Sequence, residues 1–328
     1  MKKLAGLTLI ISFLLLVFTA GLSTCYAGEE LKVGVIFSVG GLGDESFNDA
    51  TFRGLEEAEE EYGISFDYVE PGEIAEMEEH QRSFAEAGYD LIIAVGFLQE
   101  SAMMEVAQDY PGTNFAIVDG IVDLPNVSSL TFKEHEGSFL VGVVAGMMTE
   151  TNVVGFVGGM QVPLIEKFQV GFEEGVEYVN PQATVLVSYA GDFGDPGKGK
   201  ELALSQFERD ADIIYHASGG TGVGVIEAAE ENEFFAIGVD EDQDHLAPGY
   251  VLTSMLKRVD VAAYNIVQDL FYDQVESGIL SFGVVDEGVA TSDFTYTRDL
   301  VPAEVFETLE DVKAKIIEGE ILVTDPTL

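Results

Sequence analysis

Short apolar segments of strand length alternate along the chain with longer segments of helical periodicity. The first half of this alternation begins after residue 30. Strands that alternate with helices predict a parallel sheet whose two faces are covered by helices. The runs are continuously apolar, as is typical of parallel strands buried on both sides. We predict strands at 31–39, 64–70, 91–96, 114–120 and 127–132, and helices at 47–62, 73–87 and 98–109.

The same alternation restarts near residue 132, so the chain contains two α/β units of similar size in series. No segment rich in Pro or Ser separates them, which predicts two lobes joined by ordered crossings. An amphipathic helix at 259–274 follows, and the tail contains short strands and a helix near 302–318. In the second unit we predict helices at 137–150, 161–179, 197–209 and 223–232, and strands at 153–159, 183–191, 211–220, 234–242 and 250–256.

The first residues have the composition of an export signal. "MKK" is followed by "LAGLTLIISFLLLVFTAGL", which carries no charge. A basic start before an apolar run predicts a signal peptide, which we place at residues 1–27. Because the run is somewhat long for a signal, an uncleaved membrane anchor is the alternative.

The next residues, "LSTC" (22–25), resemble a bacterial lipobox, in which the cysteine becomes the lipidated N-terminus. The position before the cysteine is usually Gly, Ala or Ser and is Thr24 here. The alternative is cleavage after Ala27, which removes Cys25. Cys25 is the only cysteine, so the folded body holds no internal disulfide, cysteine zinc site or catalytic thiol.

The chain is strongly acidic. It has 15 basic and 59 acidic residues, for a net charge of −44. The predicted signal holds Lys2 and Lys3 and no acid, so its removal leaves 13 basic residues against 59 acidic ones, a net charge of −46. Such a chain repels nucleic acid and anionic membrane surfaces. The acids are spread along helices, and we infer a solvated surface adapted to high salt.

Polar residues follow several predicted strands at the same end of the sheets, which is where open α/β sheets bind ligands. These candidates are Asp44, Ser46, Phe47, Asn48, Asp119, Gly219, Gly220, Asp240, Asp242 and Lys257. Each has a structural alternative. Asp44 and Asn48 can cap the following helix, Phe47 and Phe52 can belong to the core, Asp119 can be a turn residue, and Lys257 can face solvent. Their convergence favours a binding site.

Enzyme motifs are absent from the sequence. There is no GxSxG, HExxH or GxxxxGK[ST]. "GGTGVGVIE" (219–227) lacks the third glycine of the dinucleotide fingerprint. The histidines show no metal-ligand spacing, and we expect His80 and His135 to lie at the surface of helices. A hard cation at "DEDQD" (240–244) is an alternative, but we expect no metal and no cofactor.

Several long segments, in the same order, resemble the basic membrane protein family of ABC transporter substrate-binding lipoproteins, which are similar to purine nucleoside receptor A. The segments that carry this resemblance are "GDESFNDATFRGL" (43–55), "FAIVDG" (115–120), "FKEHEGSFLVGVVAG" (132–146), "VGFVGGM" (154–160), "GDPGKGKELA" (194–203), "HASGGTGVGVIEAAEE" (216–231), "AIGVDEDQ" (236–243) and "LTSMLKRVDVAAY" (252–264).

The resemblance implies a type I periplasmic-binding-protein fold, in which two doubly wound α/β lobes joined by a three-crossing hinge close on a ligand. The crossings then fall near 131, 255 and 282. Lobe 1 comprises 31–131 and 256–282, and lobe 2 comprises 132–255 and 283–328. The helix at 259–274 then packs on lobe 1.

The resemblance also implies a purine nucleoside as the ligand. Phe52, and with it Phe47, resembles the family's stacking aromatic, and Asp119 resembles its base-binding carboxylate. Asp240 or Asp242 is implied to accept from ribose hydroxyls beside Gly238 and Gly220, and Lys257 to donate to a ribose oxygen. Asp44 and Asn48 complete the polar rim. The only candidate for a second stacking ring is Tyr215.

We therefore expect an exported, lipid-anchored and monomeric solute-binding protein that delivers its ligand to an inner-membrane permease driven by a separate ATPase. Three alternatives stay open: a binding protein for another polar solute such as a sugar, a receptor without a transport partner, and an enzyme such as a nucleoside hydrolase. Aromatic rings on both sides of the site would favour a base over a sugar. "GDPGKGKELA" is either a turn into a helix or, through Lys198 and Lys200, a contact with the transporter.

Overall fold

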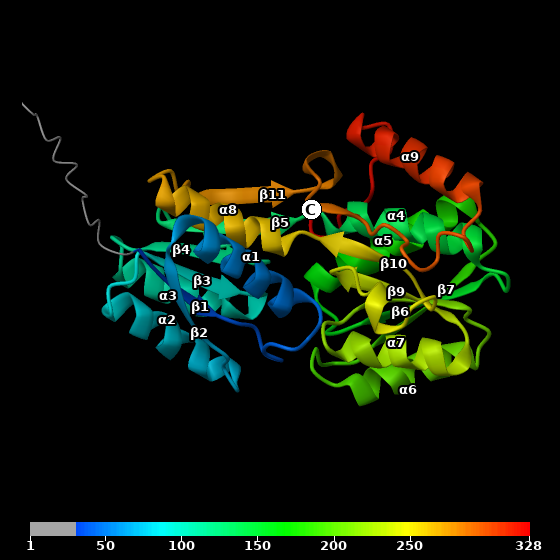
Figure 1. The fold of residues 1–328 in the computed structure, drawn as a ribbon, viewed down its shortest axis with the longest axis horizontal. Coiled ribbons are helices and arrows are strands. Elements are labelled where there is room, and N and C mark those ends of the chain that lie inside the picture. Colours follow the sequence, from blue (N-terminus) through cyan, green and yellow to red (C-terminus); the bar gives the residue numbers. More distant parts are fainter. Residues whose placement is uncertain (1–30) are drawn as a thin grey trace, which may run out of the picture. The chain divides into compact units, whose positions relative to one another are not determined.

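A computed structural model of the protein describes residues 31–328. The predicted signal peptide, its alternative as a membrane anchor, and the predicted lipidation at Cys25 lie outside the described residues. The described chain folds into two α/β lobes, each built on its own sheet (Figure 1).

The sheet of lobe 1 is parallel throughout. Its β11 is an edge strand that comes from late in the sequence and pairs with β5. The strands in spatial order are β11 (Gly278–Phe282), β5 (Val127–Phe132), β4 (Asn114–Val118), β3 (Leu91–Val95), β1 (Lys32–Ile36) and β2 (Ser65–Val69).

The sheet of lobe 2 is parallel except at one edge, where β12 runs antiparallel to β10. The strands in spatial order are β12 (Val289–Thr291), β10 (Val251–Lys257), β9 (Phe235–Asp240), β8 (Ile213–Ala217), β6 (Val153–Gly158) and β7 (Thr184–Tyr189).

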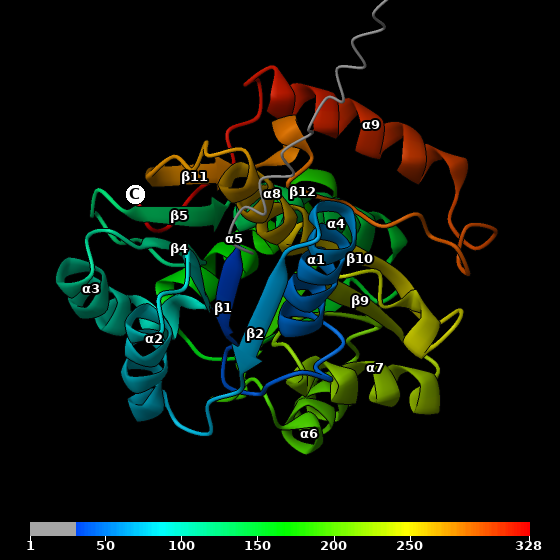
Figure 2. The same ribbon diagram turned by 60° about the vertical axis from the view of Figure 1, so that its left-hand side comes forward.

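Helices cover both faces of each sheet (Figures 1 and 2). The α-helices are α1 (Phe47–Tyr62), α2 (Met77–Glu86), α3 (Glu100–Asp109), α4 (Glu134–Met148), α5 (Pro163–Val179), α6 (Pro196–Phe207), α7 (Thr221–Asn232), α8 (Val259–Phe271) and α9 (Ala303–Ile317). Short 3₁₀ helices are η1 (Ile74–Glu76), η2 (Phe97–Gln99), η3 (Asp244–Leu246) and η4 (Val284–Asp286).

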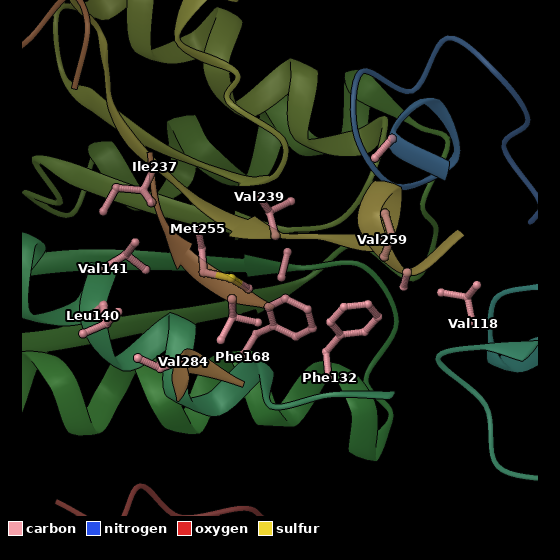
Figure 3. Close-up of a cluster of buried hydrophobic side chains, with 14 of the residues drawn as sticks. Val118, Phe132, Leu140, Val141, Phe168, Ile237, Val239, Met255, Val259 and Val284 are labelled. Carbon is pink, nitrogen blue, oxygen red and sulfur yellow. The ribbon is translucent and has the colours of Figure 1, made fainter. Parts of the chain in front are cut away.

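Strand β3 is apolar at every position because both of its faces are buried. Leu91, Ile93 and Val95 belong to the core that packs against α1 and α8, whereas Ile92 and Ala94 belong to the core that packs against α2 and α3. A strand buried on both faces needs apolar side chains at every position. The same core that reaches α1 and α8 continues into lobe 2, where Figure 3 shows Ile237 and Val239 of β9 as part of the cluster that contains Val118 of β4.

The predicted fold class is confirmed. The chain passes from the first sheet to the second after β5, returns after β10 with α8 and β11, and leaves again to form β12. Helix α8 packs against α1, so the helix expected at 259–274 does lie on lobe 1.

Candidate ligand-binding site

A cavity of about 280 Å³ lies where the carboxyl ends of strands from both sheets meet. This is the place where open α/β sheets bind ligands, because the loops after parallel strands converge there. Lobe 1 contributes the loops that follow β1, β3 and β4, and lobe 2 contributes residues that follow β7, β8 and β9 together with one face of α5.

Eight of the predicted candidates line this cavity. They are Asp44, Phe47, Asn48, Asp119, Gly219, Gly220, Asp240 and Lys257. The structure therefore brings together residues that are up to 213 positions apart in the sequence, from Asp44 to Lys257. Phe52, Gly238, Asp242 and Tyr215 do not line it.

The loop before α1 is held by the side chain of Asp44. Its carboxylate accepts hydrogen bonds from the backbone N–H groups of Ser46 (3.0 Å), Asn48 (3.0 Å) and Asp49 (3.2 Å). It also accepts one from the Asn48 side-chain amide, whose oxygen in turn accepts from the Ser38 N–H (3.0 Å). The capping alternative thus describes Asp44, which satisfies N–H groups in the first turn of α1. The Asn48 side chain instead links Asp44 to the backbone of Ser38. Burial raises the pKa of Asp44, although these backbone donors act against it.

Phe52 lies away from the cavity, so its expected role in stacking is not supported by its position. Its ring packs against Phe37 (centroids 6.2 Å apart), Phe66 (5.6 Å) and Tyr68 (5.6 Å) over β1 and β2. Phe47 and Phe52 are five residues apart, which separates them by about 140° around a helix. Only Phe47 can therefore face the cavity while Phe52 faces the sheet.

Gly238, Asp242 and Tyr215 also require correction. A Cβ on Gly238 would lie 2.4 Å from Ser254 Oγ and 2.6 Å from Gln243 Oε1, so this glycine makes room for neighbouring side chains rather than for a ligand. Asp242 lies past the end of β9 and accepts a hydrogen bond from the N–H of Asp244. Tyr215 is fully buried in the core, and its hydroxyl pairs with Ser138 Oγ at 3.0 Å.

Four buried charged side chains form what we name the buried ion cluster: Asp119, Glu134, Lys167 and Lys257. Lys257 Nζ lies 2.5 Å from Asp119 Oδ2 and 3.0 Å from Glu134 Oε1. Glu134 also forms an ion pair with Lys167, whose Nζ donates to the Phe132 carbonyl at 2.5 Å. Two acids and two bases make the cluster neutral when all four are ionised, which offsets the cost of burying its members. Burial raises the pKa of Asp119, against the opposing effect of the Lys257 ammonium.

The expected solvent-facing alternative for Lys257 is wrong, because its side chain is only 2% exposed. Burial opposes its charge, but the carboxylates of Asp119 and Glu134 outweigh that effect and raise the pKa of Lys257. Burial likewise opposes the ionisation of Glu134, yet the ammonium groups of Lys257 and Lys167 lower its pKa. Lys257 and Glu134 are therefore both charged.

Aromatic rings surround the Lys257 ammonium. Its Nζ lies 5.2 Å from the ring centroid of Phe47, 5.1 Å from that of Phe132 and 5.3 Å from that of Phe168. These distances fall within the range of cation–π attraction. Figure 3 shows the Phe132 and Phe168 rings next to each other in the cluster of buried side chains.

Asp240 connects the two lobes. Its Oδ2 accepts a hydrogen bond from Ser46 Oγ at 2.5 Å. Burial raises the pKa of Asp240 to about 7, against the opposing effects of the Lys257 ammonium and the Ser46 hydroxyl. This carboxyl group therefore changes its charge near neutral pH.

Two further contacts join the same segments. Gln243 Nε2 donates to the Glu45 carbonyl at 2.7 Å, and Arg53 forms an ion pair with Glu241. Gln243 is held from the other side, since its Oε1 accepts from the Val239 N–H (2.9 Å) and pairs with His216 Nε2 (3.0 Å). The segment after β9 thus rests on the start of α1.

Two buried polar atoms at the cavity have no hydrogen-bond partner among the described residues: Asp119 Oδ1 and Ser218 Oγ. Buried polar groups almost always have a partner. A carboxylate oxygen and a hydroxyl that lack one are able to bind the polar groups of a ligand.

The site also contains residues that the sequence did not single out. Phe97, Phe168 and Phe193 line the cavity, as does Ser218, and Glu134 and Lys167 lie behind it. Phe193 and Phe97 each follow a strand, so the same rule about carboxyl ends of strands would have found them. His135, expected at a helix surface, is instead buried in α4.

Within residues 31–328, no group of three or more His, Cys, Asp or Glu side chains is arranged to hold a metal ion. The helices of this part of the chain are all too short or too polar to cross a membrane.

Comparison with known proteins identifies the family. The family model for Bmp, described as ABC transporter substrate-binding protein PnrA-like, matches residues 31–327. The chain belongs to this family. The resemblance predicted from the sequence is confirmed, and so is the expectation that the protein is a substrate-binding protein of an ABC transporter rather than an enzyme.

Relatives and solved structures agree with this family. The CD4+ T-cell-stimulating antigen of Listeria monocytogenes is 34% identical, over 91% of this chain and 89% of the relative. The ABC transporter nucleoside-binding protein BmpA of Lactococcus lactis is 30% identical, over 90% and 89%. A crystal structure of an ABC transporter solute-binding protein from Aeropyrum pernix has a TM-score of 0.84 and 30% identity, and the match covers 90% of this chain and 94% of that one.

The Bmp segment "GDPGKGKELA" (194–203) forms the start of α6. The Asp195 side chain caps the helix by accepting from the Lys198 N–H at 2.9 Å. Lys198 pairs with Glu201 (3.0 Å), and Lys200 pairs with Glu231 (2.8 Å). These contacts favour the structural interpretation of this segment over a contact with the transporter.

Proposed function

We propose that the protein captures a purine nucleoside between its two lobes and delivers it to an ABC importer. The observation that carries this proposal is the placement of aromatic rings from both lobes at one cavity: Phe47 and Phe97 from lobe 1, and Phe168 and Phe193 from lobe 2. Rings that approach from both sides suit a flat base, whose faces stack on aromatic side chains. The neutral buried ion cluster suits an uncharged ligand.

Polar groups at the cavity complement such a ligand. Asp119 Oδ1 is free to accept from a base N–H, and Lys257 retains a donor for an oxygen of the ligand. Asp240, at the opposite lobe, would accept from ribose hydroxyls. The printed name of the Lactococcus lactis relative, a nucleoside-binding protein, supports the same ligand class.

The proposal extends to partners and location. Contacts to both lobes exist only when the lobes are closed, so ligand binding would shift the protein to the closed state that a permease with its ATPase accepts. We take lobe 1 as 31–131 with 256–282 and lobe 2 as 132–255 with 283–328, which the strand membership of the two sheets supports. The protein would be an exported monomer, held at the outer face of the membrane by a lipid on Cys25.

Calorimetric titration tests the ligand. The protein is titrated in molar NaCl with inosine, guanosine, adenosine, cytidine and ribose. We expect purine nucleosides to bind one per chain, and ribose alone to bind far more weakly or not at all. Ribose affinity equal to that of inosine would indicate a sugar-binding protein, and absence of heat with every nucleoside would refute the proposal.

Asp119→Asn tests the contact to the base. Because it removes the carboxylate that accepts from the base, we expect it to weaken inosine and guanosine binding by about 1–3 kcal/mol. Adenosine, which lacks the N1–H donor, should lose less. The matched control is Asp123→Asn, in the same loop but exposed, which should bind as the wild type does. Unchanged inosine affinity in folded Asp119→Asn would remove Asp119 from the site.

A further inference from the structure

Glu134 and Lys167 do not line the cavity, yet they contact a residue that does. We propose that this pair positions the Lys257 ammonium in the ligand site and thereby determines the affinity for the ligand. The inference rests on the proposed function in that its affinity test uses a nucleoside.

The geometry shows how Lys257 is held. Its Nζ lies between two carboxylates that come from different parts of the fold: Asp119 after β4 of lobe 1, and Glu134 at the start of α4 in lobe 2. An ammonium group has three N–H donors. Lys257 donates one of them to Asp119 Oδ2, whereas its contact with Glu134 Oε1 is an ion pair without hydrogen-bond geometry. A donor therefore remains for the ligand, and Asp119 Oδ1 remains as a neighbouring acceptor.

Glu134 is itself fixed. Its side chain has no exposure to solvent, and its second oxygen pairs with Lys167. Lys167 also donates to the carbonyl of Phe132, the last residue of β5, where the chain passes to lobe 2. Lys257 is the last residue of β10, where the chain returns. The buried ion cluster therefore ties together two of the segments that connect the lobes.

The charges explain why both members of the pair are needed. Without Glu134, two buried ammonium groups would face Asp119 alone, and Lys257 would be free to turn fully toward Asp119. Without Lys167, the remaining two acids and one base would leave a buried negative charge. Either single loss leaves an uncompensated buried charge, which is strongly destabilising.

Stability alone does not account for the pair, because a buried ion pair can often be replaced by neutral groups of similar volume at little or no cost in stability. What a neutral pair lacks is the second carboxylate that fixes Lys257 Nζ. The two roles can therefore be separated by removing both charges at once.

The experiment compares four proteins with the wild type: Glu134→Gln, Lys167→Met, the double variant E134Q/K167M, and a double control variant, Glu231→Gln with Lys200→Met. The control removes an ion pair at the surface whose charged atoms are 2.8 Å apart. We expect both single variants to melt at lower temperature. The double variant should melt close to the wild type and yet bind inosine roughly tenfold or more weakly. The double control variant should match the wild type in both measurements.

A second measurement requires no nucleoside. The carboxylates that face Lys257 are Asp119, Glu134 and Asp240, so loss of Glu134 should let Lys257 lose its proton at lower pH. NMR of protein labelled with ¹³C at the lysine Cε, titrated toward alkaline pH, should show this shift in E134Q/K167M and not in the double control variant.

The outcomes are distinct. A folded double variant with wild-type inosine affinity and an unchanged Lys257 titration overturns the positioning role. If the wild type binds no nucleoside while the Lys257 titration shifts as expected, the proposed ligand is wrong and the positioning of Lys257 stands.

Discussion

At the scale of single residues, Asp240 links ligand binding to pH. Its buried carboxyl group has a pKa of about 7, and its ionised form accepts hydrogen bonds from ribose hydroxyls more strongly than the neutral acid does. Binding should therefore release a proton near neutral pH. We expect inosine affinity to rise by up to about tenfold between about pH 6 and pH 8, as the ionised fraction rises. Calorimetry in buffers of different ionisation enthalpy measures the released proton directly.

The free energy of unfolding of the ligand-free protein should fall as the pH rises, whereas the inosine affinity should rise. The folded pKa of Asp240 is raised above the unfolded value of about 3.9, so the folded state binds the extra proton between these two values. This contribution is favourable at low pH and is lost as pH rises toward 7. Asp240→Asn should remove the pH dependence of both inosine affinity and stability. Asp242 does not line the cavity, so Asp242→Asn should keep both. A wild-type pH profile in Asp240→Asn would assign the linkage to another group.

The positions of residues at the cavity were predictable where the chain topology dictates them. Asp119, Asp240 and Lys257 each end a strand or follow one directly, so their convergence follows from the parallel sheets. Glu134 was not predictable, because an acid in the first turn of a helix is ordinarily explained by the helix dipole. Phe168 was missed because an apolar residue on an amphipathic helix has the same pattern whether it faces a core or a cavity.

At the scale of elements, the pairing of α4 with α5 depends on glycine. A Cβ on Gly175 would lie 2.1 Å from the backbone oxygen of Phe139, and one on Gly142 would lie 2.4 Å from that of Phe172. The backbones of the two helices thus approach more closely than any side chain at these positions would allow. This contact brings Phe168 and Lys167 of α5 toward the site.

Gly175→Ala tests this packing. In an isolated helix the change would gain about 1 kcal/mol, but here the methyl group meets a backbone carbonyl that cannot rotate away. We expect the cost of overpacking to exceed the gain in helix propensity. The free energy of unfolding should fall by about 1–2 kcal/mol, which lowers the melting temperature. Gly112→Ala, in a turn with no atom within 4 Å of the added Cβ, is the control and should melt as the wild type does. An equal or higher melting temperature for Gly175→Ala would show that the helices can separate freely.

The elements themselves were largely predictable. The strand patterns agree with β1 to β10, since full burial of parallel strands leaves a continuous apolar run. The helix ends were less certain: α4 begins at Glu134 rather than at 137. The pattern there gave no signal, because the first turn of α4 is polar in sequence although it packs against α5 and the end of β10.

At the scale of the whole molecule, contacts between segments that are far apart in the sequence could not be predicted from sequence patterns. Arg53 pairs with Glu241, and Ser46 with Asp240, across more than 180 residues. Nothing in the local sequence of α1 distinguishes Arg53 from any solvated basic residue. These pairs follow from the way the two lobes meet, which becomes visible only when both sheets are formed.

The net charge of −44 should make the stability of the whole fold depend on salt. Acidic side chains outnumber basic ones about fourfold, so most carboxylates repel one another without a compensating partner. The range of this repulsion is about 30 Å at 0.01 M salt and about 3 Å at 1 M. We expect the melting temperature to rise clearly between these two NaCl concentrations, as followed by calorimetry or circular dichroism.

A charge-reduced variant separates screening from a general effect of salt on apolar burial. Glu56, Glu59 and Glu60 are exposed on α1, so changing all three to Gln removes repulsion without altering the core. If screening is the cause, this variant should melt above the wild type at 0.01 M NaCl and approach it at 1 M. If salt acts by strengthening apolar burial instead, both proteins should gain equally, because their buried surfaces are the same. Equal melting temperatures of the wild type in low and molar salt would contradict adaptation of this surface to high salt altogether.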